Sequence, residues 1–380
     1  MAAVDQPAPT GPHWIAARLR AEVASRRLQH DPAQVAAARH LDALRNALTG
    51  RPPGVLDRLH RAVSSEARAK ARTPRGVYLW GGVGRGKTLL MDLFFSSLRD
   101  APGAPPAERS HFYHFMRDVH AQLAAVRQLE RPLDAVAARV AARTRVICLD
   151  EFFVADIADA MILSALFESL FGRGVALVAT SNLRPEDLYK DGLQRQRFLP
   201  AIAMIEAKLD VVRLDGGIDY RLRQLEQAPT YLDSNHPGTK GALAARFASL
   251  GGDAAGPAVL DIAGRPLRAV NCAAGTVWFD FRELCGGPRS QMDYIEIARL
   301  YHTVFIDDIP LFDAPDDDAA RRFIMLIDEF YDRGVKIVVS AAAKPAALYR
   351  GERLRAEFER AASRLVEMQT QAYLAGQHRP

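Results

Sequence analysis

The sequence predicts an α/β fold in which helices cover a parallel β-sheet, and three observations support this class. Short apolar runs alternate with segments of helical periodicity. Two of these runs, "RVICLD" (145–150) and "VALVATSN" (175–182), are typical of strands buried on both faces. A glycine-rich loop also joins an apolar strand to a helix within 76–99. Strands that alternate with helices predict a parallel sheet with crossover connections.

The elements follow in order along the chain. Helical periodicity dominates 14–50, with a break near Asp31-Pro32 and an end at Gly50, and another helix is expected over 55–72. The segment "HFYHFM" (111–116) predicts the end of a strand that passes into a helix. Further strands are predicted at 76–80, 145–150, 175–182 and 209–214, and helices up to about Arg99 and over 117–130, 157–172 and 185–206.

The composition changes after residue 227. Residues 228–257 predict a partly helical linker, and 258–281 alternate like short antiparallel strands with turns at Gly264 and Gly275. We interpret the latter as a small β insertion outside the parallel sheet. The expected division is a disordered tail 1–13, a helical N-terminal segment 14–75, an α/β core 76–227, a linker and β insertion 228–281, and a C-terminal α/β and helical lid region 282–380.

Two stretches of the chain resemble each other. "ICLDEFF" precedes the helix 157–172 and "RGVALVATSNLRPEDLY", while "VFIDDIP" precedes a helix at 319–331 and "RGVKIVVSAAAKPAALY". No glycine–lysine loop directly precedes the second copy. Two interpretations stay open: a strand–helix–strand repeat without its own nucleotide site, or two buried units that converged on similar sequences.

Composition restricts the class of protein. A hydrophobic content of 49% suits a globular core, and no apolar run reaches the length of a membrane-spanning helix. The N-terminus does not resemble a signal peptide, and three widely spaced cysteines show neither a disulfide framework nor metal spacing. A reducing cytoplasm is therefore expected.

Basic residues gather near the N-terminus. Residues 14–75 carry 13 Lys/Arg against 5 Asp/Glu. This excess indicates a solvated helical face, or a surface for anionic lipid, acidic protein or nucleic acid. Nucleic acid is not favoured, because no aromatic residues are interleaved for base stacking.

The loop at 81–88 matches G-x-x-x-x-G-K-[ST], the phosphate-binding P-loop. Its backbone N–H groups would surround phosphate oxygens, aided by the N-terminus of the following helix. Lys87 would bind the β- and γ-phosphates, and the Thr88 hydroxyl would bind Mg²⁺. The predicted binding residues are Gly81, Gly82, Val83, Gly84, Arg85, Gly86, Lys87, Thr88 and Leu89.

Polar residues at two strand ends predict hydrolysis. Asp150 and Glu151 end the strand at 145–150, where Asp150 would hold Mg²⁺ and Glu151 would deprotonate the attacking water. Asn182, at the end of the next strand, would hydrogen-bond that water or the γ-phosphate. An arginine that stabilises the transferred phosphoryl group would complete the site, and "GLQRQRF" offers Arg195 and Arg197.

The order of these motifs is similar to that of AAA+ ATPases, and longer segments resemble the ZapE family, bacterial relatives of the mitochondrial ATPases named for ATPase family gene one. These segments include "YLWGGVGRGKTLLMDLFF", "HFYHFMRDVH", "ICLDEFFVADIADAMIL", "ATSNLRPEDLYKDGLQRQRFLPAI" and "FDFRELCGGPRSQMDY". The resemblance covers about residues 14–374. It implies an ATP- and Mg²⁺-dependent cytoplasmic ATPase that forms rings and destabilises polymers of FtsZ, or acts on another division-ring protein, at the division site near the inner membrane.

The resemblance also assigns individual residues. Arg195 occupies the arginine position of the family motif, which implies a residue that reaches a neighbouring subunit, with Arg197 as the alternative. Arg364 in "SRLVEMQ" is the candidate second sensor arginine, although Arg360 lies nearby. Gln34 falls in a family segment before the core and is expected near the adenine.

Two other functions are compatible with the same core. A helicase loader would use the basic N-terminal segment on nucleic acid, but 258–281 and "FDFRELCGGP" match no DNA-binding module that we can identify. A nucleotide-gated scaffold would use slow hydrolysis as a timer, and the presence of Glu151 weighs against it.

Overall fold

The computed structural model describes residues 11–24, 31–50, 73–154 except 83, 156–214, 225, 229–251 and 256–379 except 274 and 377. The predicted helix at 55–72 and most of the tail 1–13 lie outside these residues. The chain divides into two compact units, Met1–Gly217 and Ile218–Pro380.

The first unit contains a five-stranded parallel sheet in the order β2-β3-β4-β1-β5. Its strands are β1 Gly76–Trp80, β2 Ala107–His111, β3 Val146–Asp150, β4 Ala176–Ser181 and β5 Leu209–Arg213. The central strands are buried on both faces, which explains why their sequences are apolar throughout rather than alternating.

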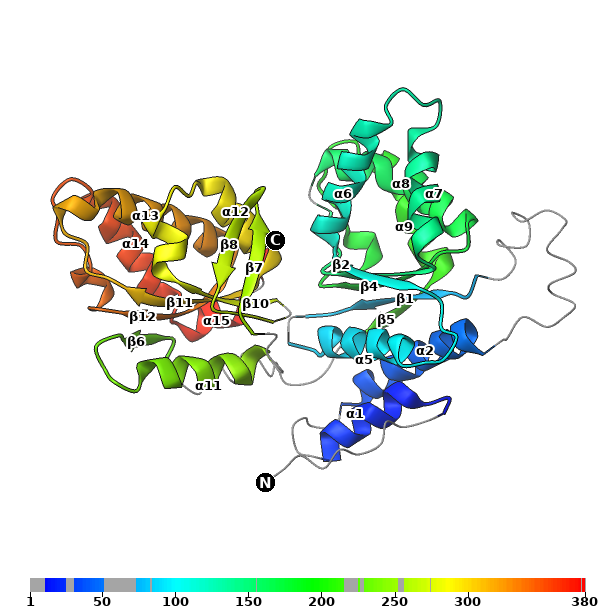
Figure 1. Cartoon of the computed structure of the whole chain (residues 1–380), viewed down its shortest axis with the longest axis horizontal. Coiled ribbons are helices and arrows are strands. Elements are labelled where there is room, and N and C mark those ends of the chain that lie inside the picture. The colour runs from blue at the N-terminus through cyan, green and yellow to red at the C-terminus, as the bar shows by residue number, and fades with distance from the viewer. Residues whose placement is uncertain are drawn as a thin grey trace, which may run out of the picture. The chain divides into compact units, whose positions relative to one another are not determined.

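Helices cover both faces of this sheet (Figure 1). One core lies under α1 Trp14–Ala24, α2 Pro32–Thr49 and α5 Lys87–Arg99. The other lies under α6 Phe112–Ala125, α7 Pro132–Arg143, α8 Ile157–Gly172 and α9 Leu199–Lys208. Neighbouring residues of β1 enter different cores, Val77 and Leu79 the first and Tyr78 the second, as the pleat of a strand requires. The predicted α/β class is confirmed.

The helix predicted over 185–206 is wrong in its first half. Only single turns of 3₁₀-helix form at Pro185–Asp187 and Arg195–Arg197, and α9 begins at Leu199. The helix is interrupted where Tyr189 and Gln194 have φ of 53° and 56°, the left-handed conformation that an α-helix does not contain. The predicted helix 117–130 begins earlier, at Phe112, and ends at Ala125.

The second unit has its own five-stranded sheet, in the order β6-β12-β11-β10-β9. Only β9 is antiparallel to its neighbour. The strands are β6 Tyr231–Asp233, β9 Asn271–Ala273, β10 Thr276–Asp280, β11 Thr303–Ile309 and β12 Lys336–Ala341. The helices are α11 Thr239–Gly251, α12 Gln291–Leu300, α13 Asp317–Asp332, α14 Arg355–Glu367 and α15 Gln371–Ala375.

The expectation that all of 258–281 stands outside a parallel sheet is wrong. β10 pairs in parallel with β11, and its residues 276–279 are buried. The apolar run "VWF" fits a strand with a core on each face. Only β7 Ala258–Ile262 and β8 Arg265–Ala269 form a separate hairpin. The region 282–380, expected as α/β with a helical lid, contains β11 and β12 of this sheet and α14, which packs on α13.

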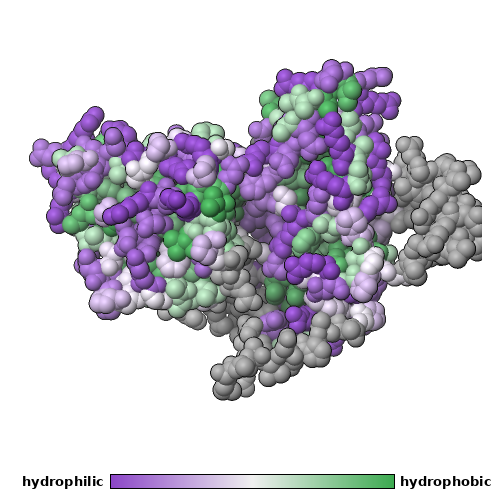
Figure 2. All heavy atoms as spheres, in the orientation of Figure 1, coloured by the Kyte–Doolittle hydropathy of each residue, from purple (hydrophilic) through white to green (hydrophobic). Residues whose placement is uncertain are grey.

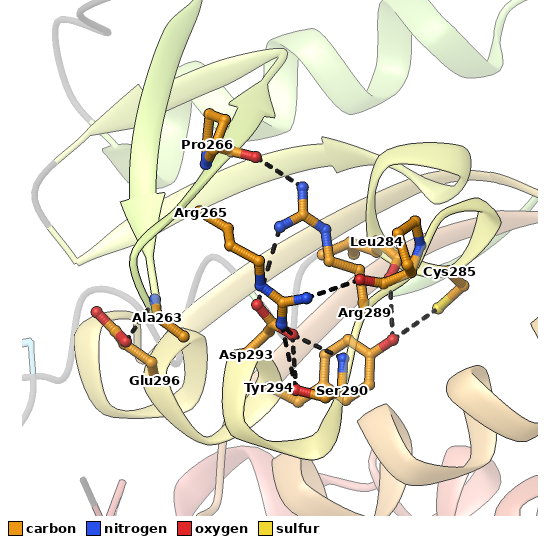
Figure 3. A network of polar contacts seen from close by, with 11 residues as sticks. Ala263, Arg265, Pro266, Leu284, Cys285, Arg289, Ser290, Asp293, Tyr294 and Glu296 are labelled. Atoms are coloured by element: carbon orange, nitrogen blue, oxygen red, sulfur yellow. Dashed lines mark hydrogen bonds and ion pairs between the residues drawn. The ribbon is translucent and has the colours of Figure 1, made fainter.

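The hairpin is anchored to α12 by charged residues. Figure 3 shows Arg265 and Arg289 converging on Asp293, whose side chain is fully buried. Close by, the backbone N–H of Ala263 donates to Glu296 Oε2 over 2.7 Å. Removing one partner of a buried ion pair leaves an uncompensated charge, so these contacts fix the hairpin against the helix.

The two units share one strand order. The first sheet contains the run β2-β3-β4-β1, and the second contains the corresponding run β10-β11-β12-β6. In both runs the strand that comes first in the chain pairs with the strand that comes last. Tyr78 Oη donates to the Leu183 carbonyl over 3.0 Å, and Tyr231 Oη donates to the Ala343 carbonyl over 2.6 Å.

The strand ends agree as well. Glu151 and Asp308 have φ of 52° and 58°, a left-handed conformation that is uncommon without glycine. The N–H of Glu151 donates to Thr180 Oγ1 over 3.1 Å, and that of Asp308 donates to Ser340 Oγ over 2.9 Å. Shared topology with shared detail favours the repeat over independent convergence.

The visible surface of each unit is mostly hydrophilic, with small scattered apolar patches (Figure 2). Among the described residues, no helix is both long enough and apolar enough to cross a membrane.

Candidate nucleotide site

The glycine loop lies between β1 and α5, at the carboxyl end of the parallel sheet. Gly81, Gly84 and Gly86 all have positive φ, and a Cβ on Gly81 would lie 2.2 Å from the Leu214 carbonyl oxygen. Side chains are therefore excluded where the backbone approaches its neighbours. Val83 lies outside the described residues, while Leu89 lies in the first turn of α5.

Lys87 is the first residue of α5 and its ammonium reaches back over the loop. Its Nζ donates to the carbonyls of Gly81 and Gly82 over 2.7 and 2.6 Å, and to Asn182 Oδ1 over 2.9 Å. The structure thus brings together the loop lysine and the residue that follows β4. A lysine is a compact cation that suits phosphate oxygens at this position.

Gln34 contacts the loop itself. This residue of α2 is 2% exposed, and its Nε2 donates to the Arg85 carbonyl over 3.1 Å. A Cβ on Gly86 would lie 2.7 Å from the same nitrogen. The N-terminal segment therefore contacts the backbone of the phosphate loop through Gln34. The role of Gln34 near the adenine stays a prediction.

The acidic pair ends β3 as predicted. Asp150 is its last residue and Glu151 follows in the left-handed conformation, held by the hydrogen bond from its N–H to Thr180 Oγ1. Asp150 Oδ1 is buried and has no hydrogen-bond partner among the described residues. Because a buried, unpaired carboxylate oxygen is costly, this atom is suited to a cation or to a water bound to one.

Edge strand β2 adds two residues that sequence reasoning missed. Arg109 Nε donates to Asp150 Oδ2 over 2.6 Å, and its Nη1 contacts Asp92 of α5. His111 Nε2 lies 3.4 Å from Glu151 Oε2. Arg109 and His111 are two residues apart, so a strand at this position places both side chains on the same face. The sequence could not show that this face lies beside Asp150 and Glu151, because that depends on the pairing of β2 with β3.

Arg109 offsets part of the negative charge of Asp92 and Asp150. Burial opposes the charge of Arg109, but Asp150 and Asp92 outweigh it, so the pKa of Arg109 is raised above its ordinary value. Burial raises the pKa of Asp92, with Arg109 acting against it and Asp150 adding to it. Arg109 therefore stays a cation between two carboxylates.

The predicted arginines make other contacts. Arg195 lies in the 3₁₀ turn, where its Nη2 donates to the Glu186 carbonyl over 2.6 Å, and Arg197 is exposed. Arg364 belongs to the second unit, where its Nη1 lies 2.6 Å from Asp328 Oδ1, and Arg360 contacts the same carboxylate. The roles of these arginines stay predictions.

The corresponding loop of the second unit is closed by its own hydrogen bonds. Asn235 N donates to Asp233 Oδ1, His236 N to the Asp233 carbonyl, Gly238 N to His236 Nδ1 and Thr239 N to the His236 carbonyl. Lys240, on the first turn of α11, lies 3.2 Å from Asp308 Oδ2. Since these N–H groups already have partners, this loop offers no phosphate cradle.

The residues of the first unit fit a nucleotide and its metal. The loop backbone and Lys87 would hold the phosphates, while Thr88 and Asp150 would supply the hard oxygen ligands that Mg²⁺ prefers. The buried, unpaired Asp150 Oδ1 is the observation that supports the metal. Glu151 directly follows Asp150 at the end of β3. Asn182 directly follows β4 and accepts a hydrogen bond from Lys87 Nζ.

A P-loop between β1 and α5, with acidic residues at the end of β3, which β4 separates from β1, defines a P-loop nucleoside triphosphatase. The family model of the AFG1-like ATPases matches residues 14–377. The chain belongs to this family and is an ATPase.

This chain is also similar to known proteins. The cell division protein ZapE of Escherichia coli K12 is 44% identical over 357 residues, covering 92% of this chain and 94% of its own. Lactation elevated protein 1 homolog B of Danio rerio is 38% identical, covering 81% and 70%. Among solved structures, DnaI matches with 15% identity and a TM-score of 0.34 over 50% of this chain and 86% of its own, and no argument rests on that likeness.

Proposed function

We propose that this chain is a Mg²⁺-dependent ATPase that couples hydrolysis to the remodelling of a protein partner at the bacterial division site. The observation that carries the proposal is the meeting of Lys87 with Asn182 beside the carboxylates that end β3. A site that only held nucleotide would have no need of a base after β3.

Each residue has one task in this mechanism. Lys87 and the loop N–H groups bind the β- and γ-phosphates, and Asn182 orients the attacking water or the γ-phosphate. Glu151 accepts the proton of that water. Thr88 and Asp150 would hold Mg²⁺, which neutralises charge on the transferred phosphoryl group.

The proposed partner is FtsZ or another division-ring protein. A relative that is named a cell division protein, with similarity over nearly its whole length, supports this choice. The experiment measures ATP turnover with and without FtsZ while light scattering follows the polymers. We expect scattering to fall with ATP and to stay high with the Glu151→Gln variant. No effect of ATP on FtsZ polymers would contradict the partner.

A helicase loader gives a different result. Its turnover would rise with single-stranded DNA, and the effect would fall steeply with salt. The same preparation therefore separates the two functions.

The proposed assembly is a homo-oligomeric ring in which Arg195 reaches the nucleotide of a neighbouring subunit. Its Nη2 donates to the Glu186 carbonyl of its own chain, and its Nε is buried without a hydrogen-bond partner among the described residues. Mixing tests this role: Arg195→Ala and Lys87→Ala are each expected to be inactive, whereas the mixture recovers turnover because the second supplies Arg195. Arg197→Ala is the control and should stay active. A mixture without recovery would contradict action in trans.

We place the protein in the cytoplasm and recruited to the division site near the inner membrane. A fluorescent fusion should gather at midcell. Uniform fluorescence in dividing cells would contradict this location.

A further inference from the structure

Arg109 contacts two carboxylates near the proposed metal position, those of Asp150 and Asp92. It extends from edge strand β2, and its side chain is 20% exposed, as is that of Asp150. Its Nε donates to Asp150 Oδ2 over 2.6 Å, while Nη1 contacts Asp92 Oδ1. One guanidinium therefore joins the end of β3 to helix α5.

Asp92 lies on the same side of α5 as a proposed metal ligand. It follows Thr88 by four residues, and residues four apart share one face of a helix. The fork of Arg109 thus lies between Asp150 and a point one turn along α5 from Thr88. This position is next to the metal site and is held by two charge-assisted hydrogen bonds.

The two oxygens of Asp150 have different surroundings. Oδ2 accepts from Arg109, whereas Oδ1 is buried without a hydrogen-bond partner among the described residues. A carboxylate held by one oxygen cannot turn freely, so its other oxygen keeps a fixed direction.

We infer that Arg109 is a positioning residue of the magnesium site, which holds Asp150 by Oδ2 and presents Oδ1 to the metal or to a water bound to it. The inference rests on the proposed Mg²⁺-dependent hydrolysis. It makes a residue outside the P-loop and the acidic pair part of the metal site.

Removing Arg109 has two effects of opposite sign. The lost positive charge would by itself strengthen the binding of a cation. Against this, Asp92 and Asp150 would face each other without a cation, rotate apart and have to be ordered again by the metal. If Arg109 acts as a positioner, the second effect is the larger, and more Mg²⁺ is needed. If Arg109 instead acts as a cation that competes with the metal, its removal lowers the Mg²⁺ concentration that is needed.

The test uses the full chain and a fluorescent, non-hydrolysable ATP analogue. Its affinity is measured in EDTA and across a Mg²⁺ titration for wild type, Arg109→Gln and Arg109→Lys. We expect Arg109→Gln to raise the Mg²⁺ concentration at half-saturation roughly two- to tenfold, the cost of ordering one side chain. The affinity in EDTA should not change. Lysine keeps the charge of arginine but lacks the forked guanidinium. The Mg²⁺ concentration at half-saturation for Arg109→Lys should therefore lie between those of wild type and Arg109→Gln.

Arg143→Gln is the matched control. Arg143 Nε donates to Glu108 Oε1 over 2.7 Å, so this ion pair also involves β2. Glu108 precedes Arg109 and therefore points to the other face of the strand. Arg143→Gln should therefore leave the affinity for the analogue unchanged, both in EDTA and in Mg²⁺.

Three results would overturn the inference. An unchanged or lower Mg²⁺ requirement in Arg109→Gln would exclude positioning. Equal weakening with and without Mg²⁺ would mean a purely structural residue. A wild-type protein whose nucleotide affinity does not depend on Mg²⁺ would contradict the magnesium proposal itself, and this inference with it. If Arg109→Gln does not fold, Arg109→Lys decides on the same criteria.

Discussion

The hydrogen bonds of Lys87 Nζ inside the structure include those to the Gly81 and Gly82 carbonyls and to Asn182. Phosphate oxygens would replace these neutral acceptors with charged ones, and such bonds contribute about 1.5–3 kcal/mol each. We therefore expect Lys87→Ala to weaken ATP binding about 100-fold or more, as measured by titration of a fluorescent nucleotide.

A lysine elsewhere in the same unit provides the comparison. Lys190 is exposed and lies 3.4 Å from Asp187, so Lys190→Ala should bind ATP like wild type. Equal losses in the two variants would remove Lys87 from the binding site.

Glu151 has a backbone conformation that costs free energy, with φ of 52°. A general base contributes about 10²–10⁴-fold to a rate. Glu151→Gln keeps the shape of the side chain but cannot accept a proton, so turnover should fall by that factor while ATP affinity stays within a few-fold. Full turnover in this variant, measured as phosphate release, would refute the assigned base.

At the scale of elements, α2 and the start of α5 depend on each other through Gly86. This residue is the N-cap of α5 with φ of 84°, and Gln34 of α2 fills the space where a Cβ would lie. Alanine there would pay about 1–2 kcal/mol for the left-handed conformation and about 1 kcal/mol for the displaced hydrogen bond of Gln34.

Gly86→Ala should therefore lower the free energy of unfolding by about 2–3 kcal/mol in urea titrations. Gly103 isolates the conformational part, because it has φ of 74° and no atom lies within 4 Å of a Cβ built on it. Gly103→Ala should cost only about 1–2 kcal/mol. If both variants lose the same amount, Gln34 moves aside without cost.

Local sequence predicted some elements well and others poorly. Helix 157–172 was predicted at its observed bounds, since Asp156 caps it and the strands on either side are apolar. The region 185–206 was predicted as helix, but α9 begins only at Leu199. Before it, Tyr189 and Gln194 have the left-handed conformation, which the sequence pattern did not indicate.

At the scale of the whole molecule, two units of one topology differ in their phosphate loops. The first loop has glycines and Lys87, while in the second the N–H groups are bonded to Asp233 and His236. We therefore expect one ATP per chain in calorimetric titration with a slowly hydrolysed analogue.

Two lysine variants test this stoichiometry. Lys240 lies on the first turn of α11, as Lys87 lies on the first turn of α5, but pairs with Asp308. Lys240→Ala should keep one site per chain, whereas Lys87→Ala should lose it. Two sites in wild type, or the loss of a site in Lys240→Ala, would contradict a closed second loop.

The sequence by itself determined the fold class, the P-loop and the acidic pair, because these depend on neighbours within a few residues along the chain. Glycines set the conformation of a loop locally, and a strand buried on both faces is apolar whatever packs on it. Asp150, Glu151 and Asn182 could be placed for the same reason, since each directly ends or follows such a strand.

Only the tertiary structure decided what surrounds these residues. Arg109 reaches Asp150 across 41 positions of sequence, and Gln34 reaches Arg85 across 51. That β6 and β10 join β11 and β12 in one sheet could not be predicted, because a helix, a hairpin and β9 separate β6 from β10 in the sequence. Strand order and register arise from packing between distant segments, so the partners that tune the site become visible only when the sheets are assembled.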